Sequence, residues 1–252
     1  MKNYKVLSFN LRINAPVDGL NSWDYRKQKV MTYLGAHDFD IIGLQEAGPT
    51  MYQELKTHMS DYDLFGHGRG MDHEAVPILV KKGKYQIIES KTLWLSETPL
   101  VESRVIGSLF PRIVTYVVIR DNEQKIISFF NTHLDYISDE VCTNQAKILS
   151  QIIDQVTHQY QCPFILVGDF NQNPDSQTIR YLSSKYQNIY HEEDRISLTF
   201  HNFTNNTKGL PIDYFFYSHQ LIDDSFEIVH HQESNFFLSD HYPLIAKFSI
   251  KA

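Results

Sequence analysis

The sequence predicts an α/β protein in which two β-sheets pack face to face and helices cover them on the outside. Apolar runs of strand length recur along the whole chain, whereas helical patterns interrupt them at only three places. Between residues 85 and 130, three strand runs follow one another with no helix among them. A doubly wound parallel sheet would need a helix between nearly every pair of strands, so these consecutive strands favour a layered sandwich.

Ten runs rich in apolar and β-branched residues are predicted as strands. In chain order they cover residues 4–9, 41–44, 77–80, 85–95, 113–119, 126–130, 164–167, 214–217, 226–230 and 243–250. The polar residues Asp121, Asn122 and Glu123 separate two of these runs and predict a hairpin turn.

Three segments show the apolar spacing of amphipathic helices. They cover residues 23–34, 50–59 and 138–159. Ser22 and Asp24 predict the N-terminal cap of the first helix. Asp139 and Glu140 place negative charge at the positive end of the third helix dipole.

Length and composition indicate one globular domain spanning residues 1–252. The hydrophobic share of 42% can build a full core, and no apolar run is long enough to span a membrane. The first ten residues enter a strand pattern at once and resemble no secretory signal, so we expect a cytoplasmic protein. Cys142 and Cys162 do not make a disulfide framework, and we expect both to be reduced packing residues.

The net charge limits the choice of ligand. With 23 basic and 30 acidic residues the formal charge is −7, which provides no excess positive field to attract a long polyanion. Extended duplex DNA is therefore disfavoured as a substrate. A small phosphorylated molecule or a single-stranded nucleic acid remains compatible with this charge.

Residues that bind metals or move protons occur where the predicted strands end or begin. Such positions are disproportionately functional, because a rigid scaffold holds them at the edge of a cleft. Carboxylates that converge repel one another, and a divalent cation is the commonest reason for such a cluster. The residues in question are Asn10, Glu46, Asn131, His133, Asp135, Asp169, Asn171, Asp213, Asp240 and His241.

Spacing adds a geometric expectation. Residues two apart in an extended chain point to the same side, so Asp169 and Asn171 are expected to face one ligand, as are His133 and Asp135. Each residue alone also has an ordinary structural explanation, such as a turn-forming Asn, a helix cap or a buried imidazole. Their joint occurrence at six strand ends favours a common site.

The motifs LSFN, LQE, NTHLD, GDFN, ID and SDH follow one another in this order from residue 7 to residue 241. This succession closely resembles the endonuclease/exonuclease/phosphatase superfamily of DNase I-like proteins, in an uncharacterised bacterial subgroup. The resemblance implies a four-layer αββα sandwich of two mixed, mainly antiparallel sheets. It also implies a phosphoester hydrolase that depends on Mg²⁺, with Mn²⁺ able to replace it.

The resemblance further implies a role for each matching residue. Glu46 would be the main metal ligand, with Asn10 and Asp240 beside it. Asp169 and Asn171 would position the attacking water and the phosphate. His133 would donate a hydrogen bond to a phosphate oxygen, and Glu74 would be its acidic partner. Asp213 would orient His241, and Arg112 would contact the substrate phosphate. The general base stays open between Asp169 and the Asp213–His241 pair.

Two further segments, residues 18–27 and 93–99, look like those of the bacterial subgroup. They make Asn21, Trp23 and Arg26 candidate substrate contacts, together with Trp94, and Asp135 is a further candidate. Packing is an equally good explanation for the two tryptophans.

Two reaction types and one non-catalytic role are compatible with these residues. The substrate is either a phosphodiester, such as an oligonucleotide, or a small phosphomonoester, and no obligate protein partner is expected. The alternative is an inactive family member that binds a phosphorylated ligand or a protein. A calcineurin-like phosphatase is disfavoured, because the strings Asp-x-His and Gly-Asn-His-Asp are absent from the sequence.

Overall fold

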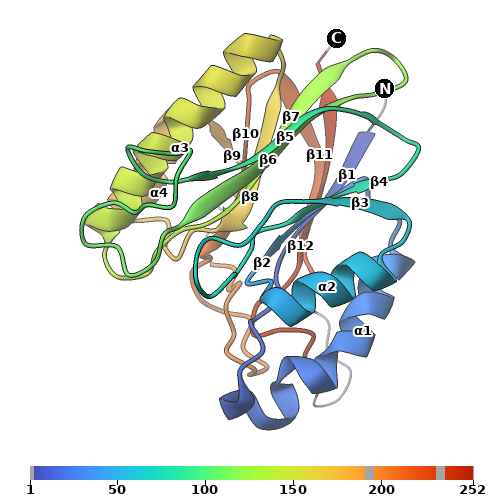
Figure 1. Ribbon diagram of the computed structural model, residues 1–252, viewed down its shortest axis with the longest axis vertical. Coiled ribbons are helices and arrows are strands. Elements are labelled where there is room, and N and C mark those ends of the chain that lie inside the picture. Colours follow the sequence, from blue (N-terminus) through green and yellow to red (C-terminus); the bar gives the residue numbers. More distant parts are fainter. Residues whose placement is uncertain (1–2, 191–195, 231–235, 252) are drawn as a thin grey trace.

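The computed structural model describes residues 3–190, 196–230 and 236–251. Two sheets of six strands pack against each other, and helices lie on both outer sides (Figure 1). The predicted four-layer αββα sandwich is therefore confirmed. Among the described residues, no helix combines the length and apolar character needed to cross a membrane.

Both sheets are mixed. The only parallel neighbours among the described strands are β1 with β2 in the first sheet and β7 with β8 in the second. The first sheet has the order β11 (Leu221–Ile228), β12 (Leu244–Ile250), β1 (Asn3–Asn10), β2 (Ile41–Gln45), β4 (Ile78–Lys81) and β3 (Tyr62–Phe65). The second has the order β5 (Gln86–Trp94), β6 (Ile113–Arg120), β7 (Ile126–His133), β8 (Phe164–Asp169), β10 (Asp213–Tyr217) and β9 (Gln187–Asn188).

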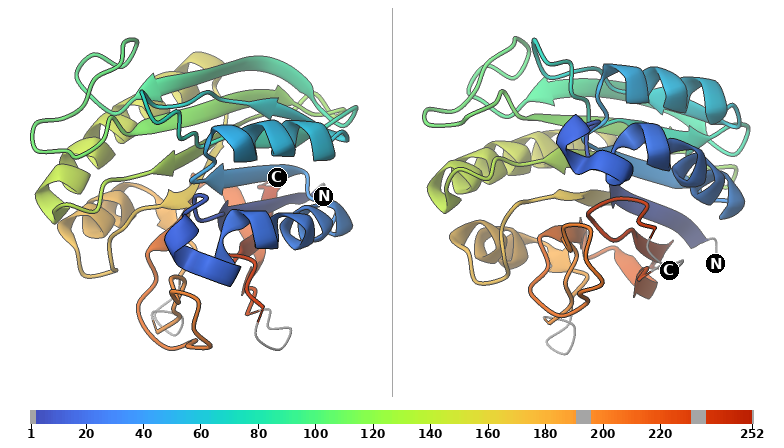
Figure 2. Two further views of the ribbon diagram at one scale, coloured as in Figure 1. Left: turned by 60° about the horizontal axis from the view of Figure 1, so that its bottom comes forward. Right: turned by 90° about the horizontal axis from the view of Figure 1, so that it is seen from below.

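The helices form the two outer layers. The short 3₁₀ helix η1 (Pro16–Asn21) leads into α1 (Trp23–Ala36), which packs with α2 (Pro49–His58) on the first sheet. On the opposite side α3 (Asp139–Tyr160) and α4 (Gln177–Lys185) cover the second sheet, as both views of Figure 2 show.

Most of the predicted elements are present. All ten predicted strand runs overlap observed strands, the three predicted helices match α1, α2 and α3, and the predicted hairpin joins β6 to β7. The structure adds β3, β9 and α4, which the sequence analysis did not identify. Ser22 occupies the N-cap of α1 without a capping side-chain hydrogen bond, and both cysteines are buried and free.

A buried amide joins the two sheets beneath the site. The side chain of Asn131, fully buried on β7, donates through Nδ2 to the carbonyl oxygens of Leu44 (2.7 Å) and Pro77 (2.9 Å) in the first sheet layer. Its Oδ1 accepts from Gln45 Nε2 at 2.7 Å. Close approach is possible because the facing residue Gly43 has no side chain; a Cβ there would lie 2.6 Å from Val167. Asn131 therefore fixes how the two sheets sit on each other.

We predict that Asn131→Ala lowers the free energy of unfolding by about 2 to 3 kcal/mol, because buried polar groups lose their partners. Urea denaturation of the variant and of the control Asn205→Ala, which alters an exposed amide, measures this difference. Equal stability of the two variants would show that Asn131 does not tie the sheets together.

Candidate active site

Strand polarity brings the predicted residues to one end of the sandwich. The parallel strands β1 and β2 end there at Asn10 and next to Glu46, and β7 and β8 end there at His133 and Asp169. The antiparallel strands β10 and β12 begin at the same end, which places Asp213 and Asp240 beside them. Six distant segments thus supply one edge, as the sequence analysis predicted.

Register aligns three of these residues in a row across the second sheet. His133 is paired with Asp169, and Asp169 with Asp213. Side chains of paired residues in adjacent strands point to the same side of the sheet. Since Asp169 contacts Asn10 of β1, the row faces the first sheet.

Asn10 connects the carboxylates of the two sheets. Its Nδ2 donates to Glu46 Oε1 at 3.1 Å and to Asp169 Oδ2 at 2.9 Å. The orientation of the amide is fixed, because Oδ1 accepts from the main-chain N–H of Arg12. The group that faces the carboxylates is thus the NH₂, which is a donor and cannot ligate a cation. In this structure Asn10 therefore bridges the two carboxylates, and its role beside the metal stays a prediction.

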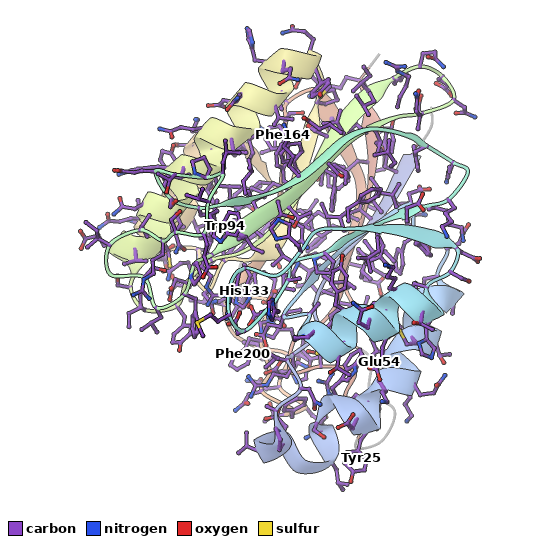
Figure 3. The ribbon with its side chains drawn as sticks, in the orientation of Figure 1. Tyr25, Glu54, Trp94, His133, Phe164 and Phe200 are labelled. Atoms are coloured by element: carbon purple, nitrogen blue, oxygen red, sulfur yellow. The ribbon has the colours of Figure 1, made fainter. Side chains whose placement is uncertain are left out.

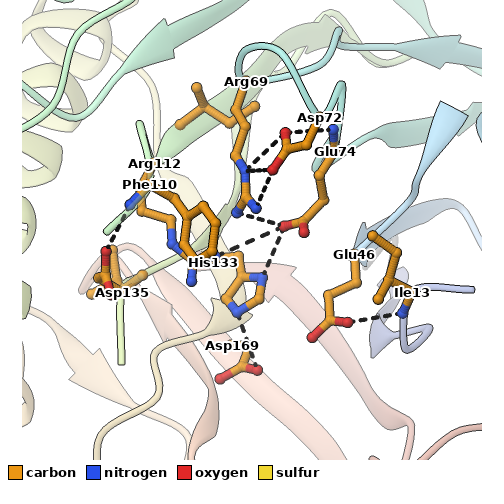
Figure 4. A network of polar contacts seen from close by, with 12 residues as sticks. Ile13, Glu46, Arg69, Asp72, Glu74, Phe110, Arg112, His133, Asp135 and Asp169 are labelled. Atoms are coloured by element: carbon orange, nitrogen blue, oxygen red, sulfur yellow. Dashed lines mark hydrogen bonds and ion pairs between the residues drawn. The ribbon is translucent and has the colours of Figure 1, made fainter. Parts of the chain in front are cut away.

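The donor set fits a hard divalent cation. One ligand atom each from Glu46, His133 and Asp169 lies within 4.8 Å of the others (Figure 4), and Asp240 lines the same cavity as Glu46. Burial raises the pKa of Asp169, and the charge of Asp213 raises it further. Burial also raises the pKa of Asp240. Incompletely compensated carboxylate oxygens of this kind are suitable ligands for Mg²⁺ or Mn²⁺.

The two histidines carry different charges. Burial alone would lower the pKa of His241, but its contact with Asp213 and the charges of Asp169 and Asp240 raise it to about 10. His241 Nδ1 lies 2.9 Å from Asp213 Oδ2, as predicted for an orienting pair, and its Nε2 lies 3.7 Å from Asp169. His241 is thus an imidazolium at neutral pH.

His133 is neutral. Its burial, reinforced by the charge of Arg112, lowers its pKa to about 3. Nδ2 of Asn171 lies 3.0 Å from His133 Nε2 and also donates to the carbonyl of Leu134, so Nε2 must be the acceptor. The imidazole proton is then on Nδ1, 3.6 Å from Glu74 Oε1. This arrangement supports Glu74 as the acidic partner of His133, whereas the hydrogen bond from His133 to a phosphate oxygen stays a prediction.

A group of arginines adds positive charge to the other wall of the site (Figure 4). Arg69 binds Glu74 at 2.8 Å and Asp72 at 2.6 Å, and its guanidinium lies 4.3 Å from the Phe110 ring centre. Arg112 packs on the same ring at 5.3 Å, and its Nε and Nη1 have no hydrogen-bond partner among the described residues. A buried guanidinium with unused donors is suited to binding an anion.

These groups enclose a cavity of about 350 Å³. Figure 3 locates its residues His133 and Phe200 at one end of the sandwich. Its lining residues are Arg12, Ile13, Glu46, Arg69, Glu74, Phe110, Arg112, His133, Tyr136, Asp169, Asn171, Phe200, Ile212, Asp240 and His241. Of these, the sequence analysis missed Arg12, Ile13, Arg69, Ile212 and the three aromatic residues. They lie on loops, where no periodic pattern indicates which side chains turn inward.

Three residues of the active end have backbone φ angles in the left-handed region. These angles are 54° at Arg12, 58° at Glu46 and 53° at Asn171. Such conformations cost of order 1–3 kcal/mol each and persist only where the surrounding structure enforces them. In this site the enforcing contacts include Ile13 N to Glu46 Oε2 at 2.8 Å and Asn171 N to Asp169 Oδ1 at 2.9 Å.

Several predicted substrate contacts lie outside the cavity lining. Trp23 and Arg26 are fully buried in the packing of α1, and Asn21 ends η1. The indole N–H of Trp94 donates to the carbonyl of Arg69 and so holds the loop that carries Arg69.

Asp135 is also fully buried. One carboxylate oxygen accepts from Ser108 Oγ and the main-chain N–H groups of Leu109 and Phe110, and the other from those of Tyr136 and Ile137. The prediction that Asp135 and His133 face one ligand is wrong, because the extended strand β7 ends at His133. Asp135 instead anchors the loop that carries Phe110.

A two-sheet αββα sandwich with carboxylates, amides and histidines at one edge defines a DNase I-like protein. The chain belongs to the Endonuclease/Exonuclease/phosphatase family, whose sequence model matches residues 7–241. Members of this family similar to this chain include nucleases and phosphatases.

Solved structures of bacterial proteins are similar over the whole chain. An endonuclease/exonuclease/phosphatase from Bacteroides vulgatus is 28% identical with a TM-score of 0.89, and the similarity covers 100% of both chains. A mannosyl-6-phosphatase from Bacteroides thetaiotaomicron is 26% identical with a TM-score of 0.90, covering 98% of this chain and 100% of that one.

Curated relatives are longer proteins. The CCR4-Not complex 3'-5'-exoribonuclease subunit Ccr4 of Mycosarcoma maydis is 22% identical over 99% of this chain, which covers 51% of that protein. Protein angel of Drosophila melanogaster is 25% identical over 73% of this chain and 56% of its own length. The chain thus spans about half the length of these relatives.

We predict that ¹⁵N NMR shows His241 doubly protonated and His133 as a neutral Nδ1–H tautomer throughout about pH 5 to 8, where ordinary imidazoles titrate. Asp213→Asn removes the strongest influence that raises the pKa of His241, so its signal should move to the neutral form as pH rises through this range. Asp224→Asn, an exposed change on β11, is the matched control. An unchanged His241 signal in Asp213→Asn would contradict this assignment.

Proposed function

We propose that this protein is a Mg²⁺-dependent phosphomonoesterase that releases inorganic phosphate from a small phosphorylated molecule, such as a sugar phosphate. The observation that carries the proposal is that three kinds of group line one small cavity. They are the buried Arg112 guanidinium, whose Nε and Nη1 have no hydrogen-bond partner among the described residues, the protonated His241, and the carboxylates of Glu46, Asp169 and Asp240. Cationic donors and metal-binding carboxylates around one space suit a phosphoryl group.

Glu46 would hold the cation, with Asp240 beside it, and Asp169 would face the attacking water in the same cavity. When bound, the cation supplies Lewis-acid polarisation of the phosphoryl oxygen. Asn10 keeps the carboxylates of Glu46 and Asp169 at a fixed separation through its two hydrogen bonds. The main-chain N–H of Ile13 orients Glu46 from the other side.

Asp169 is the proposed general base. The pKa of His241 is raised to about 10, so this imidazolium has no free basic nitrogen at neutral pH. Burial and the charge of Asp213 raise the pKa of Asp169, which makes its carboxylate a stronger base than an exposed one. Asp169 would accept the proton of the water that attacks phosphorus, the ester P–O bond would break, and the leaving alcohol would take up a proton. His241 and Arg112 would stabilise the negative charge on the phosphoryl oxygens.

Size and charge favour a small substrate over a polymer. A cavity of about 350 Å³ accommodates a phosphoryl group with a compact leaving group. The chain carries a net charge of −7, which gives no long-range attraction for a nucleic acid. The similar Bacteroides thetaiotaomicron structure is a mannosyl-6-phosphatase, which is consistent with this substrate class.

Aromatic residues at the cavity offer faces to the leaving group. Phe200 is 39% exposed, and its ring centre lies 5.0 Å from that of His241. Tyr136 is 58% exposed and lines the same cavity. Such faces pack against the C–H groups of a sugar ring, and they would equally accept a base, so the test includes an oligonucleotide.

A substrate panel tests the proposal. Phosphate release is measured from mannose 6-phosphate, other sugar phosphates and a mononucleotide, and product release from a single-stranded oligonucleotide and bis(p-nitrophenyl) phosphate. We expect the sugar phosphates to be hydrolysed fastest, with activity lost in EDTA and restored by Mg²⁺ or Mn²⁺. Asp169→Asn should lower kcat by about 10² to 10⁴, the usual contribution of a general base.

Asp175→Asn is the matched control for Asp169→Asn, because it makes the same change at an exposed position that does not line the cavity. Undiminished turnover in excess EDTA would reject the metal requirement. Preferential degradation of the oligonucleotide would make the protein a nuclease. Binding of phosphate esters without turnover of any of them would indicate the non-catalytic family member.

A further inference from the structure

Arg26 on α1 is a buried cation whose hydrogen bonds all go to main-chain carbonyl groups. Its side chain is fully buried, and it donates at 2.9 Å to the carbonyl of Leu11 and at 3.0 Å to that of Arg12. It also donates to the carbonyl oxygens of Asn21 and Leu238. Burial lowers its pKa to about 10, so it remains charged at neutral pH.

These carbonyl groups belong to three separate segments. Leu11 and Arg12 follow β1, Asn21 ends η1, and Leu238 precedes Asp240 by two residues. The planar guanidinium has five N–H donors in a fixed arrangement, which allows it to hold several acceptors at once. Arg26 thus joins the chain that leaves Asn10 to the chain that enters Asp240.

The segment after β1 sets the geometry of the proposed metal-binding carboxylates. Arg12 has a left-handed φ of 54°, and its main-chain N–H fixes Asn10 Oδ1 at 2.9 Å. The next residue, Ile13, donates its N–H to Glu46. Any relaxation of Arg12 would turn the Asn10 amide and release Glu46 together, and the bond from Arg26 to the Arg12 carbonyl opposes that relaxation.

We infer that Arg26 is a positioning residue for the metal-binding side of the site, which acts through the segments around Arg12 and Leu238 without touching the substrate. This inference rests on the proposed function. The positive charge of Arg26 opposes cation binding, because it interacts with Asp240 and Glu46, so any gain in metal affinity that Arg26 provides comes from geometry. Residues that orient ligands in this way commonly change metal affinity 10- to 100-fold when altered.

A purely structural role is the competing explanation. The guanidinium also lies 5.7 Å from the ring centre of Trp23 and 5.8 Å from that of Phe203, so its loss would weaken packing as well. Val30, fully buried one turn along α1, provides the comparison. Val30→Ala removes packing from the same helix without removing a hydrogen bond to the site segments.

The experiment is a Mn²⁺ titration followed by the EPR signal of free Mn²⁺, together with kcat, KM and thermal unfolding, for wild type, Arg26→Met, Arg26→Lys and Val30→Ala. We expect Arg26→Met to bind Mn²⁺ about 10- to 100-fold more weakly. Its kcat at limiting metal should fall more than KM rises. Arg26→Lys keeps the charge and some of the donors, so it should recover part of the affinity, whereas Val30→Ala should lose stability with unchanged Mn²⁺ affinity.

The outcomes separate this inference from the proposed function. If wild type neither binds Mn²⁺ nor hydrolyses a phosphoester, the proposed function fails. If wild type does both and the folded Arg26 variants bind Mn²⁺ like wild type, or if Val30→Ala loses as much affinity as they do, the positioning role is wrong. Should Arg26→Met fail to fold, Arg26→Lys decides between these results.

Discussion

The site depends on one amide that holds two like charges together across the sandwich. Asn10 belongs to the first sheet, and its NH₂ group bonds both Glu46 from that sheet and Asp169 from the other. Two carboxylates so placed repel each other, and the shared donor offsets part of that repulsion. The contact also requires the sheets to be fixed relative to each other, which the buried Asn131 hydrogen bonds provide.

The same environment gives chemically identical side chains different tasks. His133 and His241 are both buried beside Asp169, yet His133 has Arg112 as neighbour and His241 has Asp213. One imidazole therefore stays neutral and the other charged. The cationic donors and the basic carboxylate of the site thus need no further change of protonation before a phosphoryl group enters, and this reduces the reorganisation that accompanies the reaction.

Much of this site could be predicted from strand ends alone, because a packed scaffold restricts where charged side chains can lie. Glu46, Asp169, Asp213 and His241 stand next to long apolar runs, and the topology brings these ends to one edge. The prediction was less successful where residues left the strands. Asp135 turns toward its own loop after β7 ends. Arg69 and Phe200 lie on irregular loops, where no repeating sequence pattern indicates which way a side chain points.

The remaining errors have similar causes. Arg26 was a candidate substrate contact, but four carbonyl acceptors and the packing of α1 place it inside the protein. The helix α4 has nine residues, too few to show an apolar stripe, and it docks through Asp139 of α3, which accepts from its first N–H groups. The strand β9 has only two residues, and its existence depends on β10.

The central claim is that residues between Asn10 and His241 surround one divalent cation. Anomalous diffraction from crystals grown with Mn²⁺ tests it most directly. We predict a peak within ligand distance of Glu46, on the side of the cavity that Asp240 lines. A peak confined to other surfaces of the protein, or a cavity without a peak at saturating Mn²⁺, would contradict it.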